Sequence, residues 1–228
     1  MENNLKHIAL IMDGNRRWAK KHNLPTLEGH RLGEERIEPL VDCAIEMGIS
    51  YLTFWAFSTE NWHREKREVK FLMKLYRTLL DRKADSFHKK NVRINCIGNL
   101  SLFSSDLQAK TKRWMEQTKN NKLITVNLAL NYGGKDEIIR AVNKWQKENK
   151  KNQELTKDIL ADYLDSAGQP DPDLIIRTGG EKRLSGFLMW QSEYSELYFT
   201  RTYWPDFTPL KFRLAIAEYK RRQRRFGK

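Results

Sequence analysis

Apolar residues occur in short continuous runs, separated by longer stretches in which they recur every three or four positions. The first run covers residues 8–12 without any alternation, and a second, at 49–57, is rich in aromatic and β-branched side chains. Such runs are typical of strands buried on both faces of a parallel sheet. Further strands are expected at 92–97, 123–130 and 173–177.

Between these runs, apolar residues at helical spacing predict amphipathic helices. One stripe covers residues 37–45, where Gly48 would end the helix and Pro39 predicts a kink or a late start. A loop is expected before it, at 22–27, and a solvated connection at 144–157. Other helices are expected at 69–87, 102–118, 138–145, 156–164 with Thr156 as cap, and 212–219.

The length of 228 residues suffices for one sizeable core, so we expect a single domain over residues 1–228. The two cysteines, Cys43 and Cys96, lie far apart without metal-ligand spacing, which excludes a disulfide framework and fits a reducing cytoplasm. The N-terminus lacks the apolar core of a signal peptide, and no run reaches membrane-spanning length. Any membrane contact is therefore expected to be peripheral.

The charge balance points to anionic partners. Forty-two Lys and Arg against 29 Asp and Glu leave a net charge of +13. Nucleic acid, a lipid headgroup surface and phosphorylated small molecules all fit this charge, and charge alone does not choose among them.

Polar residues suited to metal and anion chemistry follow the first strand directly. Asp13 is a Mg²⁺-type ligand, Gly14 lets the backbone approach a ligand, Asn15 is a good helix cap, and Arg16 and Arg17 add positive charge. In open α/β sheets, ligands bind at such strand ends, where a helix begins. An ordinary strand-to-helix turn with surface arginines explains these residues as well.

Two later strands also end in polar residues. The second is followed by the run from Ser58 to Arg64, for which a helix capping box is an alternative that can coexist with a functional role. The strand at 173–177 ends in a glycine loop that carries Arg177 and Arg183. Their guanidinium groups match phosphate oxygens and could cradle a second anion, although solvated arginines would look the same.

Taken in chain order, the segments HIALIMDGNRRWA, GH, FWAFSTENW, NYGGKDEI, DLIIRTGGEKRLSGFLMW and SELYFTRTYWPDF resemble the cis-prenyltransferases of the undecaprenyl diphosphate synthase family. The resemblance covers nearly the whole chain. The DDxxD element of the trans-prenyltransferases does not occur. The resemblance implies a single α/β domain, with a central, largely parallel sheet flanked by helices and an apolar product tunnel, that works as a homodimer. The helices around Leu40 and Leu72 would line that tunnel.

The resemblance also implies an activity. The enzyme would use Mg²⁺ to add isopentenyl diphosphate units in cis to an allylic diphosphate, usually farnesyl diphosphate. The product would be a long-chain cis-polyprenyl diphosphate such as undecaprenyl diphosphate, the precursor of the cell-wall lipid carrier. A shorter-chain synthase, a basic nucleic-acid-binding protein and a non-catalytic subunit of the same fold remain alternatives, and Asp13 argues against the last.

Residue roles follow from the resemblance by position. Asp13 and Glu196 match the metal ligands, with Asp13 also assisting departure of the diphosphate, and Ser58 and Asn61 match the pair associated with proton removal. The allylic diphosphate is expected to lie by Gly14, Asn15, Arg16, Arg17, Trp18 and His30. The rest of the site is expected to include Thr59, Glu60, Trp62 and Arg64, with Arg177, Arg183, Leu184 and Ser185 forming the isopentenyl diphosphate pocket.

The chain departs from the family pattern at three positions. Thr26 stands where a basic residue is usual, Gly186 replaces an asparagine, and Pro39 is unusual inside its helix. These departures bear on affinity and product length rather than on the reaction. The ending at residues 225–227 resembles the family's RxG element, which would reach the partner's site.

Overall fold

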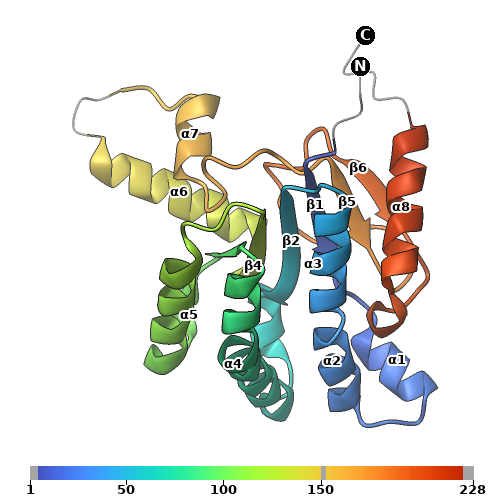
Figure 1. The fold of residues 1–228 in the computed structure, drawn as a ribbon. Helices are drawn as coiled ribbons and strands as arrows, with labels where there is room; N and C mark the ends of the chain where they lie inside the picture. The colour runs from blue at the N-terminus through green and yellow to red at the C-terminus, as the bar shows by residue number, and fades with distance from the viewer. Residues whose placement is uncertain (1–4, 150–152, 223–228) are drawn as a thin grey trace.

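The computed structural model describes residues 5–149 and 153–222 (Figure 1). Within these residues lies a six-stranded sheet in the order β3-β4-β2-β1-β5-β6, with every neighbouring pair parallel. The prediction of a parallel α/β sheet is confirmed. The strands are β1 (His7–Ile11), β2 (Tyr51–Ser58), β3 (Val92–Ile97), β4 (Ile124–Tyr132), β5 (Leu174–Arg177) and β6 (Glu196–Phe199).

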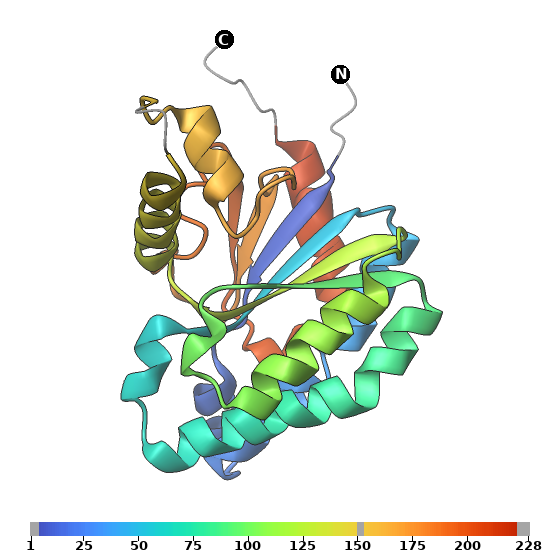
Figure 2. The same ribbon diagram turned by 90° about the vertical axis from the view of Figure 1, so that its left-hand side faces the viewer.

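Helices cover both faces of the sheet, as parallel sheets require. Figure 2 shows the sheet between α6 and α7 on one side and α4 and α5 on the other. The helices are α1 (Asn15–Lys21), α2 (Thr26–Glu34), α3 (Ile37–Glu46), α4 (Lys66–Lys89), α5 (Ser105–Thr118), α6 (Gly134–Glu148), α7 (Lys157–Tyr163) and α8 (Pro209–Arg221), with short 3-10 turns η1 (Thr59–His63), η2 (Leu100–Leu102) and η3 (Trp204–Asp206).

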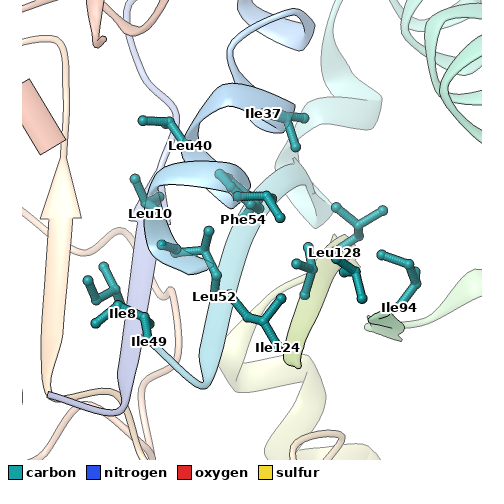
Figure 3. Packing of buried hydrophobic residues seen from close by; sticks show 14 of the residues in the cluster. Ile8, Leu10, Ile37, Leu40, Ile49, Leu52, Phe54, Ile94, Ile124 and Leu128 are labelled. Carbon is teal, nitrogen blue, oxygen red and sulfur yellow. The ribbon is translucent and has the colours of Figure 1, made fainter. Parts of the chain in front are cut away.

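Every residue of β1 is buried, which explains its continuous apolar run. Ile8 and Leu10 pack into the larger core with α3, where Ile37 and Leu40 lie near β2 residues (Figure 3). The alternate residues of β1 point into a second cluster around Phe187. Each fully buried side chain of this size contributes about 1.5–3 kcal/mol, so β1 is fixed from both sides.

Several boundaries differ from the sequence predictions. The helix α2 begins at Thr26, inside the expected loop. It ends at Glu34, and a two-residue turn separates it from α3, which begins at Ile37. Pro39 therefore lies in the first turn of α3, where its missing N–H is not needed, and α3 begins where the apolar stripe begins rather than late. The helix α6 extends to Glu148, so the first part of the expected connection at 144–157 is helical.

The strand order places the carboxyl ends of three strands side by side. The strand β1 lies between β2 and β5. The next strand in the chain, β2, pairs with one side of β1, and the later strand β5 pairs with its other side. In open α/β sheets, ligands bind in the crevice at such a reversal of strand order. Asp13, Ser58 and Arg177 all lie at this edge. No helix in the described residues is long and apolar enough to cross a membrane.

The last residue of α8 is Arg221, next to the end of the described residues. The RxG-like residues 225–227 lie outside the described residues.

Candidate active site

Asp13 joins two of the polar loops at the sheet edge. One carboxylate oxygen lies 3.0 Å from Nη2 of Arg177, at the end of β5, and the other lies 3.1 Å from Nη2 of Arg17 in α1. Arg17 also reaches Glu181 of the later loop at 3.3 Å and lies over the ring of Tyr203. The two arginine loops thus form one continuous charged edge around a single carboxylate.

The turn after Asp13 is shaped by a glycine. Gly14 precedes α1 with φ of +107°, and a Cβ there would come within 2.7 Å of the Tyr203 ring. The expectation that Asn15 caps the helix is wrong, because Asn15 is its first residue and its Nδ2 donates to the Met12 carbonyl instead. Its Oδ1 is buried without a partner among the described residues. This oxygen is an acceptor that a ligand could use.

Arg177 is a buried cation held in one orientation. Its Nη1 donates to the Ser185 hydroxyl at 2.9 Å and to the Arg183 carbonyl, while its Nε has no partner among the described residues. The Arg183 side chain itself is 62% exposed and pairs with Glu181 at 2.5 Å. Leu184 packs against the cluster around Phe187. Of the predicted second pocket, Arg177 and Ser185 therefore face the crevice, whereas Arg183 lies at the surface.

Ser58 and Asn61 form the capping box that the sequence left as an alternative. The Ser58 N–H donates to Oδ1 of Asn61 at 3.2 Å, and both residues also line the cavity. The Thr59 hydroxyl donates to Glu60 at 2.9 Å. Burial opposes ionisation of Glu60, but hydrogen bonds from its own backbone, Thr59 and Ser58 lower the pKa of this carboxyl. Glu60 therefore faces the cavity as an anion.

A buried carboxylate that sequence reasoning missed holds two predicted residues. Glu68, in the first turn of α4, accepts from Nε2 of His30 at 2.9 Å and from Nη1 of Arg64 at 2.8 Å on the same oxygen. Burial lowers the pKa of His30 despite this bond, with Arg64 and Arg16 nearby acting in the same direction. His30 is therefore a neutral donor to Glu68. The available signal was the spacing of Arg64 and Glu68, four residues apart across the start of α4.

Two tryptophans predicted to bind substrate point elsewhere. The Trp18 indole donates to Asp206 at 2.7 Å and its ring stacks on His22. The Trp62 indole donates to Asn131 at 2.8 Å. Neither residue is among those that line the cavity, and their contact with substrate stays a prediction.

Glu196 does not meet Asp13 within one chain. It is the first residue of β6, in register with Leu174 and, through β5, with Ile8 at the start of β1. This places it roughly 16 Å from Asp13 along the strands, at the opposite edge of the sheet. Its carboxylate pairs with Arg222 at 2.9 Å. Asp13 and Glu196 therefore do not meet within one chain, and the role of Glu196 as a metal ligand stays a prediction.

A cavity of about 450 Å³ opens at the charged edge and continues between helices. Its polar end includes Asp13, Asn15, Arg177 and Ser185, and its interior is lined by residues of α2, α3 and α4. Of the expected tunnel residues, Leu72 lines it, whereas Leu40 is fully buried in the core. The interior lining includes Ile37, Leu72, Met73, Leu75, Tyr76 and Leu79.

The charged edge fits a divalent cation that arrives with a phosphorylated substrate. Residues 5–149 and 153–222 contain no cluster of three His, Cys, Asp or Glu suited to a metal. Asp13 offers carboxylate oxygens where the two arginine loops meet, and Mg²⁺ is commonly held by one or two carboxylates together with substrate phosphates and water. The donor set is therefore that of a substrate-borne Mg²⁺.

Known proteins share this fold and this sequence. A family model described as "Putative undecaprenyl diphosphate synthase" matches residues 11–227. The isoprenyl transferase of Aquifex pyrophilus is 45% identical, over 98% of this chain and 96% of its own length. That of Thermotoga maritima is 46% identical, over 97% and 96%.

Two solved structures also match. Lavandulyl diphosphate synthase from Lavandula x intermedia, in complex with dimethylallyl diphosphate, superposes with a TM-score of 0.93 at 32% identity, covering 98% of each chain. A probable undecaprenyl diphosphate synthase from Campylobacter jejuni gives 0.84 at 39% identity, covering 99% of this chain and all of its own. The chain therefore belongs to the undecaprenyl diphosphate synthase family and is an isoprenyl transferase, a cis-prenyltransferase.

Proposed function

We propose that the enzyme condenses isopentenyl diphosphate units onto farnesyl diphosphate, with Mg²⁺, to give a long-chain cis-polyprenyl diphosphate such as undecaprenyl diphosphate. The observation that carries this proposal is the single cavity that joins a cationic edge to an apolar interior. An allylic diphosphate has the same two halves, a dianionic or more highly charged head and an apolar tail. The head would lie by Asp13, Arg16 and Arg17, and the tail between α3 and α4.

The charged edge suits departure of the diphosphate. Arg16, Arg17 and the backbone at Gly14 surround the position next to Asp13, where negative charge develops when the allylic C1–O bond breaks. Fixed positive groups in a crevice stabilise such charge without reorganising. When bound at Asp13, Mg²⁺ would supply further neutralisation of the leaving group.

Each condensation breaks one carbon–oxygen bond, forms one carbon–carbon bond and releases one proton. The electron pair of the C1–O bond leaves with the diphosphate, the isopentenyl double bond supplies the pair for the new carbon–carbon bond, and a proton leaves the neighbouring carbon. Ser58 and Asn61, side by side at the cavity, are assigned to position the acceptor of this proton. The apolar interior excludes the water that would capture the cation.

The second diphosphate, which the product keeps, is assigned to the loop after β5. Arg177, Arg183 and Ser185 would hold it, with Leu184 and Thr59 alongside and with Glu60 and Arg64 at the cavity wall. His30 and Asn15 would complete the allylic side.

The direct test is incubation with Mg²⁺, radiolabelled isopentenyl diphosphate and farnesyl diphosphate, followed by sizing of the extracted lipids by chromatography. A ladder that ends at long cis-polyprenyl products is expected. Absence of any elongated lipid with every allylic primer, in protein that is folded by circular dichroism, would contradict the proposal.

A shorter-chain synthase is the second candidate, because a specific observation favours it. The cavity of about 450 Å³ lies near the lower end of the usual range for small-ligand pockets, about 300–1,000 Å³. The relative with the higher of the two TM-scores is a lavandulyl diphosphate synthase bound to a five-carbon substrate. The same chromatography separates the two candidates, since a short-chain enzyme would stop after a few additions.

We further propose that residues 1–228 form one catalytic domain that works as a homodimer in the cytoplasm, with peripheral membrane contact for product release and no nucleic-acid partner. Light scattering of the purified protein tests the dimer. A gel shift with random DNA and RNA tests the last point, and salt-dependent binding without prenyl transfer would favour the nucleic-acid alternative.

A further inference from the structure

The apolar interior of the cavity contains a carboxylate that the proposed chemistry does not use. Among the described residues of α2, α3 and α4 that line the cavity, Glu34 is the one acidic side chain. Its neighbours in the lining include Ile37, Leu75 and Leu79. A charge in such a wall needs an explanation, because an ionised group is costly to cover with apolar atoms.

Glu34 lies deeper in the cavity than His30. The segment from α2 to α3 runs alongside α4 in the same direction, since His30 bonds Glu68 near the start of α4 and Glu38 pairs with Lys90 at 3.0 Å near its end. Glu34 is four residues beyond His30, about one helical turn or roughly 5–6 Å deeper. It is therefore level with the middle of α4, where the lining is otherwise apolar.

The Glu34 carboxylate has no close cation in the described part of the chain. Lys83 and Arg82 of α4 act on it through space, but Lys83 is already paired with Glu38. The remaining charged neighbours, Glu35 and Glu38, are acidic. Burial is the largest influence on the pKa of Glu34 and raises it above its usual value. The side chain thus borders the cavity half-buried and without an ion-pair partner.

We propose that Glu34 determines product length by setting the depth to which the growing chain can extend. This inference rests on the proposed elongation function. The polyprenyl tail lengthens along the apolar residues of α4 that line the cavity until it reaches Glu34. Further growth would cover an unpaired carboxylate with hydrocarbon, and that desolvation penalty favours release over another addition. Removing the charge lets the chain pass.

The test compares Glu34→Gln and Glu34→Ala with wild type, using farnesyl diphosphate and labelled isopentenyl diphosphate. Glu35→Gln is the matched control, because Glu35 is the adjacent residue, carries the same charge and is exposed where it pairs with Arg31. Both Glu34 variants are expected to shift the main product by at least one five-carbon unit toward longer chains. The control is expected to keep the wild-type distribution and the rate of the first addition.

Distinct outcomes separate this inference from the function on which it rests. If folded Glu34 variants elongate normally and give the wild-type distribution, or a shorter one, Glu34 does not set length and the proposed function stands. If wild type forms no elongated lipid at all, both fail. Thermal unfolding checks each variant, and Glu34→Gln, which keeps the side-chain size, decides the matter if Glu34→Ala does not fold.

Discussion

Arg177 and Asp13 form an ion pair at the position where the reaction would begin. The arginine side chain is 7% exposed, and the carboxylate is its ion-pair partner in the crevice. Removing a partner from a buried charge costs about 1–3 kcal/mol, whereas an amide of the same shape keeps part of the contact. Structure and chemistry can therefore be separated at this position.

We predict that Asp13→Asn abolishes prenyl transfer while the protein stays folded, and that Asp13→Ala also lowers the free energy of unfolding by about 1–3 kcal/mol. Product formation and urea unfolding measure the two effects. The result that would contradict this assignment is substantial turnover by either folded variant at saturating Mg²⁺.

His7 gives a second prediction, on stability and pH. Its Nδ1 donates to the Pro170 carbonyl at 2.7 Å and its Nε2 accepts from Thr53 at 2.8 Å, which fits the neutral ring. Burial lowers the pKa of His7 to about 4 from 6.5. The unfolded chain therefore binds a proton that the folded chain does not between these values, so stability present above pH 6.5 is lost as pH falls toward 4.

From pH 7 to pH 5 this linkage removes about 2 kcal/mol of unfolding free energy, a loss that His7→Gln should not show. Urea unfolding at both pH values measures the difference between wild type and variant. His63→Gln, at an exposed position, is the control. Identical pH dependence in wild type and His7→Gln would show that His7 is not neutral in the folded protein.

At the scale of elements, the two arginine loops meet at Asp13 yet offer different surfaces. Arg17 is tied to Asp13, whereas Arg183 lies outside with Glu181. A charge-assisted contact to diphosphate contributes about 1.5–3 kcal/mol, so losing one weakens binding roughly tenfold to a hundredfold.

We therefore predict that Arg183→Ala raises the KM for isopentenyl diphosphate by that factor and changes the allylic KM much less. Arg17→Ala should do the reverse, with a lower kcat because the leaving group loses stabilisation. Each constant is measured with the other substrate saturating. Equal shifts in both constants would mean that the loops form one shared anion pocket, since Asp13 contacts an arginine of each loop.

The helices α1 and α2 pack so closely that one residue type fits between them. A Cβ on Gly29 would lie 2.1 Å from the Asn15 carbonyl oxygen, which is backbone and cannot rotate away. Gly29→Ala should therefore cost about 1–3 kcal/mol and reduce activity, because Asn15 moves with α1.

The control for this prediction is Gly48→Ala. Gly48 has φ of +72° but open space around it, so a side chain there costs about 1–2 kcal/mol through the backbone alone. Activity per folded molecule should stay at the wild-type level in the control. An equal loss of activity in both variants would show that the Gly29 effect is one of stability only.

Features set by residues close together in the chain could be predicted from the sequence, whereas features set by distant contacts could not. The burial of β1 and the capping box at Ser58 follow from residues a few positions apart, and both were predicted correctly. The edge strand β6 and the far position of Glu196 depend on pairing with β5, which no local pattern encodes. The bond from the Trp18 indole to Asp206, 188 residues away, could not be read from the sequence for the same reason.

At the scale of the whole molecule, the cavity connects elements with separate tasks. The sheet edge supplies charge, α2 and α3 supply one wall, and α4 supplies the other. At its far side the Tyr76 hydroxyl bonds Thr111 of α5 at 2.8 Å, which fixes the position of that ring. The depth of the cavity is therefore set by helix packing, while the chemistry is set by strand order.

That strand order also determines at what stage of protein synthesis the site can assemble. One side of β1 pairs with β2, but its other side waits for β5, and the Asp13–Arg177 contact spans 164 residues. Until then β1 presents an open row of backbone hydrogen-bonding groups, a template for wrong pairing. A nascent chain that stops short of β5 can hold much of the apolar wall, together with Arg16 and Arg17, but lacks Arg177 and Ser185. The growing polypeptide therefore completes the charged edge late, after most of its length has been synthesised.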